Sequence, residues 1–240
     1  MSTPQEQQDF RQRAVDALTN FLQKYRRVFG IALIVLAVGL VALFAYVQIH
    51  NARVDDSLTQ VEELQTDYQD WLNAEEEQKA NLESSILEDA ESIIADYSGF
   101  YAASRALHIR ANVHWEEGRV EKAVQDFQRL ADEYRNSYLA PLALYNAASG
   151  LEENGKPEAA ANALSQLVDR YADTGAPEVP RALFSLGRIA EQQENFEQAA
   201  EHYRRLSEEY GNSSWTNLAK DRMIWLSTQG RIESESGSSS

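Results

Sequence analysis

One sequence block occurs three times in the second half of the chain, at residues 118–137, 155–174 and 194–213. Successive copies begin 37 and 39 residues apart. A period of this length is typical of stacked units, each of which buries its apolar face against its neighbours. The matching positions are Glu121, Glu158 and Glu197; Ala123, Ala160 and Ala199; Phe127, Leu164 and Tyr203; Leu130, Leu167 and Leu206; and Tyr134, Tyr171 and Tyr210.

Each copy predicts a pair of helices. The second helix runs from the turn to the shared tyrosine, and the first begins near Ser104, Pro141 or Pro180, where a proline suits the first helical turn. Gly118 and Gly155 mark the turns within the pairs, and Glu194 takes that place in the third copy. The predicted repeats therefore span about residues 104–137, 141–174 and 180–213.

Two further parts of the chain complete the predicted all-α solenoid. A long amphipathic helix and a second helix over residues 54–97 form a divergent first pair, for which a coiled coil is the alternative. A helix at about 214–229 is expected to cover the last apolar face, because a stack otherwise leaves it open. Residues 230–240 are polar and small and are expected to be disordered, so the repeat domain is predicted at 50–229.

The run from Val28 to Ile49 contains no charged residue. As a helix it would be roughly 33 Å long, enough to span a bilayer. It therefore predicts a single N-terminal transmembrane helix at residues 28–49. The alternatives are a buried helix of a soluble protein and a cleaved signal peptide, but the run is longer than the usual signal and no small-residue cleavage site follows it.

Basic residues predict the orientation of this helix. Lys24, Arg26 and Arg27 precede the apolar run, and only Arg53 follows it before the first acidic residues. The positive-inside rule then keeps residues 1–27 in the cytoplasm and places the repeats outside it. We expect a bacterial inner membrane with the repeats in the periplasm, and an organellar membrane is the alternative. Apolar residues recur at helical spacing before the run, which indicates either a short surface or docking helix or an extension of the anchor: Phe10, Ala14, Leu18, Phe21, Leu22 and Tyr25.

Composition limits the functions that remain. The net charge of -16 argues against nucleic-acid binding, which needs clustered lysine and arginine. There is no cysteine, so disulfides, thiolate metal sites and lipid attachment to cysteine are excluded. The histidines His50, His108, His114 and His202 show no metal-ligand spacing, and no phosphate loop or nucleophile elbow is present. We therefore predict no enzyme activity, no cofactor and no metal.

The repeat columns resemble the tetratricopeptide repeat. That family expects a small residue in the middle of the first helix, found here as Ala111, Ala148 and Gly187. Its signature tryptophan is replaced by leucine, and the copies are longer than the common period of about 34 residues. A cytoplasmic N-terminus, one anchor and an external repeat domain are together similar to the layout of the ancillary subunit of the bacterial Sec translocon. Outer-membrane assembly lipoproteins share the repeat type but need a lipidated cysteine, which this chain lacks.

The resemblance also implies a partner-binding surface on the first helices, lining a concave groove. Aromatic residues there suit an apolar side chain, asparagines an extended backbone, and arginines a carboxylate. The groove positions of the family also fall on Ile109 and Ser185 in this sequence. At any single position, the alternative interpretation is an ordinary solvated residue. The candidate contact residues are Arg105, His108, Asn112, Trp115, Tyr145, Asn146, Ser149, Arg181, Phe184 and Arg188.

These features predict a membrane-anchored protein-interaction module. The first hypothesis is an adaptor or holding chaperone that binds exported or envelope proteins, or extended segments of them, near the Sec translocon. The alternatives are a structural scaffold of an envelope complex, such as division or cell-wall synthesis machinery, and a regulatory accessory subunit of such a complex.

Overall fold

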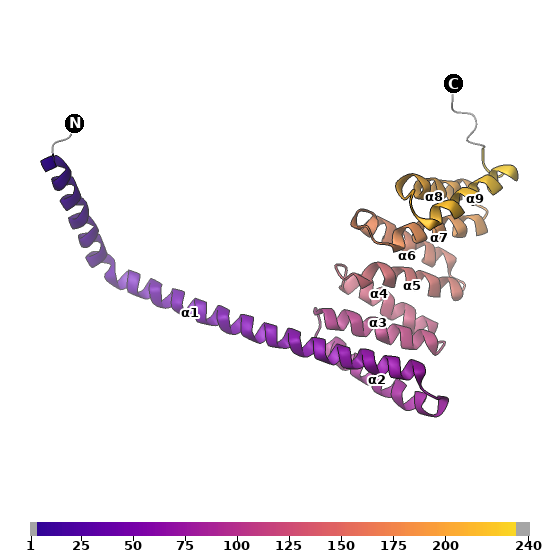
Figure 1. Ribbon diagram of the computed structural model, residues 1–240, viewed down its shortest axis with the longest axis horizontal. Helices are drawn as coiled ribbons and strands as arrows, with labels where there is room; N and C mark the ends of the chain where they lie inside the picture. Colours follow the sequence, from indigo (N-terminus) through magenta and orange to yellow (C-terminus); the bar gives the residue numbers. More distant parts are fainter. Residues whose placement is uncertain (1–3, 234–240) are drawn as a thin grey trace, which may run out of the picture. The chain divides into compact units, whose positions relative to one another are not determined.

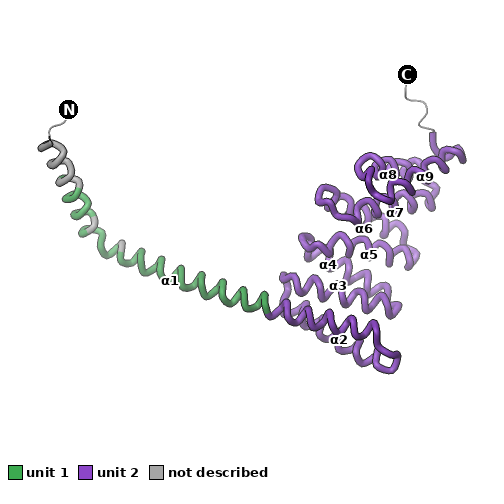
Figure 2. Tube along the Cα trace, viewed as in Figure 1, with its two compact units in different colours: residues 1–55 green, residues 56–240 purple. Residues whose placement is uncertain are grey.

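The computed structural model describes residues 4–233, and it describes the side chains of residues 13, 15–21, 23–28 and 30–233. Contacts divide the chain into two compact units, Met1–Asp55 and Asp56–Ser240 (Figure 2). Every regular element within the described residues is a helix, so the predicted all-α class is confirmed there. The disorder predicted for residues 234–240 concerns positions outside the described residues.

The first unit consists of the N-terminal part of α1 (Pro4–Asn73). The helix continues without a break from residues 4–27 into the apolar run. All side chains of residues 31–50 are exposed, although most of them are apolar. The stretch of α1 that starts at Gly30 is the one described helix long and apolar enough to cross a membrane, and the apolar window within it has no buried residue. Of the predicted amphipathic face, Leu18, Phe21 and Tyr25 are exposed, whereas the side chains of Phe10, Ala14 and Leu22 lie outside the described set.

The second unit is a stack of antiparallel helices that follow one another in chain order (Figure 1). The C-terminal part of α1 lies beside α2 as the first pair, and the two share one buried core. The pairs α3/α4, α5/α6 and α7/α8 follow, and α9 packs on the last of them. The helices are α2 (Glu76–Asp96), α3 (Tyr101–Glu116), α4 (Val120–Glu133), α5 (Leu139–Glu153), α6 (Pro157–Tyr171), η1 (Ala172–Thr174), α7 (Glu178–Gln192), α8 (Phe196–Glu209) and α9 (Ser214–Thr228). We call α3, α5 and α7 the first helices and α4, α6 and α8 the second helices.

The turns inside the pairs share one backbone geometry. Gly118 and Gly155 both have a φ of 69°, and Glu194 has a φ of 58°. At each turn the following residue donates its N–H to a carbonyl four residues before the turn residue, for example Arg119 to His114 at 2.8 Å. This is the helix-ending arrangement that glycine favours, because a Cβ is strained in the left-handed region. The third copy therefore places a glutamate where the other two have glycine.

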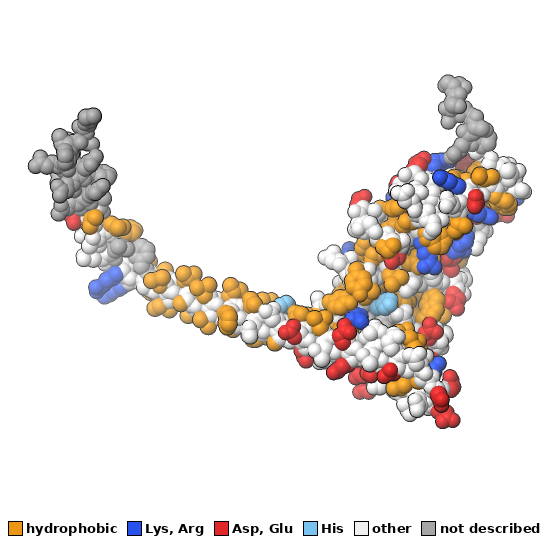
Figure 3. All heavy atoms as spheres, in the orientation of Figure 1, with side chains coloured by type: hydrophobic (Ala, Val, Ile, Leu, Met, Phe, Trp, Pro, Cys, Tyr) orange, Lys and Arg blue, Asp and Glu red, His pale blue; other side chains and the backbone are white. Residues whose placement is uncertain are grey.

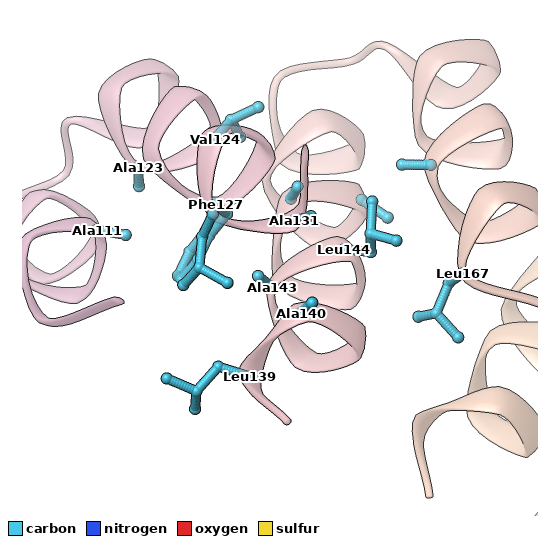
Figure 4. Close-up of a cluster of buried hydrophobic side chains, with 14 of the residues drawn as sticks. Ala111, Ala123, Val124, Phe127, Ala131, Leu139, Ala140, Ala143, Leu144 and Leu167 are labelled. Carbon is cyan, nitrogen blue, oxygen red and sulfur yellow. The ribbon is translucent and has the colours of Figure 1, made fainter. Parts of the chain in front are cut away.

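The core of each pair is built from the repeated small and large positions. Figure 4 shows the ring of Phe127 pointing between the helices toward Ala111 and Ala143, all of which are buried. In the α7/α8 pair the same space is filled by the ring of Tyr203, which lies against Gly187. The small residue of the first helix thus admits the large residue of the second.

Each shared tyrosine bonds to the backbone of the connection that joins its own pair to the pair before it. The hydroxyl of Tyr171 donates to the carbonyl of Arg135 at 2.9 Å, and that of Tyr210 donates to Ala172 at 3.3 Å. The hydroxyl of Tyr134 accepts the N–H of Gly99 at 3.3 Å. The tyrosine column therefore ties successive pairs together at one edge of the stack.

The described chain continues past α9 for a few ordered residues. Gly230 ends the helix with a φ of 65°, as in the earlier turns. The guanidinium of Arg231 lies 4.8 Å from the ring centroid of Phe196, and Ile232 packs against the core. Residues 230–233 thus contact the stack, although the sequence pattern places them in the polar tail.

Candidate protein-binding face

The predicted contact residues lie on α3, α5 and α7. Helix α3 contacts α5, and α5 contacts α7, so the three helices form one layer of the stack. None of the ten candidate contact residues is buried: nine are half-buried, and Arg181 is exposed. We call this set of ten side chains the first-helix face. Two other mapped residues are excluded from it, because Ile109 is 1% and Ser185 is 5% exposed.

The α3 end of the first-helix face is already engaged with its surroundings. Arg105 pairs with Glu62 of α1 at 2.6 Å. His108 shares a hydrogen bond with Asn112 at 3.2 Å through its Nδ1, while its buried Nε2 has no partner. Burial, helped by nearby Arg105, lowers the pKa of His108 below its ordinary value, so the ring is neutral near pH 7. Trp115 packs over Phe127 with ring centroids 6.5 Å apart.

Between α5 and α7 the first-helix face is held by side-chain contacts across the two helices. Arg188 donates to both carboxylate oxygens of Glu152, at 2.7 and 2.6 Å. The hydroxyls of Tyr145 and Ser185 are 3.5 Å apart. The guanidinium of Arg181 lies over the ring of Tyr145, 4.0 Å from its centroid. These contacts fix the spacing of neighbouring first helices. Of the remaining residues, Ser149 donates to the carbonyl of Tyr145 in its own helix, and Asn146 is half-buried on α5.

Helix α9 adds side chains to this layer that the sequence interpretation assigned only to capping. The ring of Trp215 is 5.4 Å from that of Phe184. Arg222 donates to Glu191 of α7 at 3.0 Å, and Tyr203 donates to the same carboxylate at 2.6 Å. Burial and this carboxylate together raise the pKa of Tyr203, so its hydroxyl stays protonated. Beside Arg222, Leu218 and Trp225 remain 46% and 45% exposed.

Two hollows lie at the connections between pairs. One of about 750 Å³ and one of about 600 Å³ flank Tyr138, whose side chain is 71% exposed and bonds to Tyr101 at 2.9 Å. Among the described residues no group of histidine, aspartate or glutamate is arranged to hold a metal ion. None of the ten side chains of the first-helix face lines either hollow.

Known proteins identify this architecture. A family profile described as a tetratricopeptide repeat-like domain matches residues 19–170, and one described as a tetratricopeptide repeat matches residues 145–214. No curated protein sequence matches the chain.

Solved structures share the fold at low identity. A tetratricopeptide repeat protein from Parabacteroides merdae superposes with a TM-score of 0.52 at 19% identity, over 72% of this chain and 61% of that one. The chain thus matches less than two thirds of that protein's length. The apo form of RapI gives a TM-score of 0.50 at 15% identity, over 70% of each chain.

The fold and the layered first helices define a helical repeat protein of the kind that binds other proteins. More particularly, the chain belongs to the tetratricopeptide repeat-like domain family, whose profile covers more than half of it.

Proposed function

We propose that this protein is a membrane-anchored adaptor or holding chaperone that binds extended segments of exported or envelope proteins. Residues 28–49 would be the anchor, residues 1–27 would lie in the cytoplasm, and the repeats would lie on the opposite side of a bacterial inner membrane. The similarity of this layout to the ancillary subunit of the Sec translocon favours a position near that complex.

The observation that carries the proposal is the first-helix face itself. Rings, amides and guanidinium groups lie together in one layer of packed helices, and all of these side chains are half-buried except that of Arg181, which is exposed. Half-buried aromatic and arginine side chains are the kind that dominate binding energy at protein interfaces. A polypeptide crossing successive first helices would meet several of them at once.

The exposure of the apolar run supports the proposal that residues 28–49 are a membrane anchor. Residues 31–50 have no protein contacts that bury them, and side chains such as Leu33, Val35 and Phe44 are 65%, 65% and 71% exposed. Leaving so much apolar surface in water is unfavourable by roughly 25 cal/mol per Å². A lipid environment removes that cost.

Site-specific photocrosslinking in bacterial cells tests the proposal. A photoreactive amino acid at position 146, on the first-helix face, should capture exported proteins or translocon subunits, whereas one at Gln128, exposed on α4, should not. One stoichiometric partner at position 146 would instead favour a scaffold or an accessory subunit. Equal capture at both positions would contradict binding through the first-helix face.

Orientation is tested separately with protease. When the outer membrane is permeabilised, added protease should digest the repeats and spare the N-terminal segment. Digestion of the N-terminal segment with protection of the repeats would contradict the proposed localisation.

A further inference from the structure

Helix α9 has three exposed large apolar residues, Leu218, Ile224 and Trp225, and the first and last of these share a helix face with Arg222. Leu218 and Trp225 are 46% and 45% exposed, and Arg222, which lies over the ring of Trp225 at 4.5 Å, reaches Glu191 of α7. A helix that only closes a solenoid presents a polar outer face. The apolar residues on the face of α9 from which Arg222 reaches α7 therefore indicate that α9 extends the first-helix face.

Most charged groups in this layer are already neutralised. Glu152 is paired with Arg188, Glu191 with Arg222, and Arg105 with Glu62. Arg181 differs from the other arginines of the first-helix face, because no carboxylate within the described residues is paired with it. It contributes an uncompensated positive charge at an exposed position.

The surroundings of Arg181 leave its hydrogen-bond donors available. Its guanidinium stacks 4.0 Å from the ring centroid of Tyr145 and lies 5.7 Å from that of Trp215. Stacking occupies the flat face of a guanidinium, whereas its N–H groups point outward in the plane and suit the two oxygens of a carboxylate.

Charge distribution favours this end of the stack for an acidic ligand. Residues 56–96 hold 13 acidic residues and one basic residue, Lys79. Figure 3 shows these acidic side chains gathered at the α1 and α2 end, whereas basic and apolar side chains are interleaved over α7 and α9. A ligand carboxylate would be repelled at the first end and attracted at Arg181.

We infer that α9 completes a specific subsite that recognises a carboxylate next to an aromatic or large aliphatic side chain in an extended segment. The subsite, called here the Arg181 patch, consists of Tyr145, Arg181, Phe184, Trp215, Leu218 and Trp225. Arg181 binds the carboxylate, and Phe184 with the residues of α9 contacts the neighbouring apolar side chain. This inference rests on the proposed function and names the class of segment that the surface selects.

Peptide binding to the full-length protein in detergent micelles tests the Arg181 patch. The probes are three dye-labelled peptides with blocked ends, each with a Leu-Phe pair in a Gly-Ser frame, followed by Glu, Gln or Lys. Fluorescence anisotropy should show the Glu peptide binding about tenfold more tightly than the Gln peptide. This is the difference in affinity expected from one additional charge-assisted hydrogen bond. The Lys peptide should bind most weakly.

Variants separate the two parts of the subsite. Arg181→Gln should abolish the difference between the Glu and Gln peptides while preserving binding of both. Trp225→Ala should weaken all three peptides. Arg129→Gln is the matched control, because Arg129 is an exposed arginine of α4 paired with Glu133 in its own helix. It should change none of the affinities.

Two results would overturn the inference. One is equal affinity for the Glu and Gln peptides, and the other is an undiminished preference in Arg181→Gln. Absence of peptide binding would also overturn it. If crosslinking at position 146 still captured partners in that case, the proposed function would stand without the Arg181 patch, whereas failure of both experiments would reject both.

Discussion

The ring of Tyr203 occupies the space that a side chain at position 187 would need. A Cβ built on Gly187 would lie 2.4 Å from Cε1 of Tyr203 and 2.6 Å from its Cζ, well inside van der Waals contact. The α3/α4 and α5/α6 pairs combine an alanine with Phe127 or Leu164 at these positions, and the α7/α8 pair combines glycine with tyrosine. The two positions therefore form a size-matched unit in each pair.

We expect Gly187→Ala to lower the free energy of unfolding by about 1–3 kcal/mol, because a rigid buried ring must move. Denaturant titration followed by far-UV circular dichroism measures this. Adding Tyr203→Leu, the combination found at Ala148 and Leu164, should recover part of the loss. Gly211→Ala is the control, since the nearest atom to its Cβ would be 3.6 Å away. A Gly187→Ala variant as stable as the parent would contradict this packing.

Glu194→Gly should stabilise the protein by roughly 0.5–1 kcal/mol. The glutamate has a φ of 58°, and glycine adopts this region without strain, although its greater freedom in the unfolded chain offsets part of the gain. The reverse change, Gly155→Ala, should destabilise by a similar amount, because Gly155 has the same geometry with open space around it. Thermal denaturation of both variants checks the sign, and a destabilised Glu194→Gly would be inconsistent with strain at this turn.

Tyr171→Phe should cost about 0.5–1.5 kcal/mol, the usual contribution of one intramolecular hydrogen bond. The lost bond joins its hydroxyl to the carbonyl of Arg135 in the preceding turn. Tyr138→Phe removes a hydroxyl of a highly exposed side chain and serves as the control, with little expected change. Equal effects of the two changes on the denaturation midpoint would argue against a structural role for the tyrosine column.

Acidification should destabilise the repeats through buried histidine. Burial lowers the pKa values of His108, His114 and His202 below 6.5, so the unfolded chain binds protons more readily than the folded one. The stability that the neutral histidines contribute is fully present above the pKa of histidine in the unfolded chain. It is lost as the pH falls below about 6.5. His108→Gln should lose less stability than the parent between pH 7.5 and pH 5.5 in denaturant titrations. An identical pH dependence in both proteins would exclude a contribution from His108.

The helix pairs were predictable because their contacts are local in the repeat. The spacing of Ala123, Phe127 and Leu130 encodes the buried face of a second helix, and the turn position of Glu194 followed from its alignment with Gly118 and Gly155. The residues at the positions of Ala123, Phe127 and Leu130 are buried in all three copies. A period of small and large residues was sufficient to infer this packing.

Whether each arginine on the first helices is paired with a carboxylate could not be predicted in the same way. Arg188 and Glu152 are 36 residues apart, and Arg105 and Glu62 are 43 residues apart, so their pairing depends on the offset between stacked helices. Arg181 has no such carboxylate partner among the described residues. The contribution of Trp215 and Trp225 was missed for a related reason. The amphipathic pattern of α9 indicates which residues are apolar, but not that part of its apolar surface stays beside α7.

The tyrosine ties also bear on how such a chain can change in length. Each tie joins a pair only to the turn before it, through a hydroxyl that travels with the pair and a backbone group that any sequence supplies. A duplicated or deleted pair would therefore bring or remove its own connection without requiring a compensating substitution elsewhere. Growth or shortening of the stack by whole pairs is thus structurally inexpensive, whereas loss of half a pair would leave a tyrosine without its acceptor.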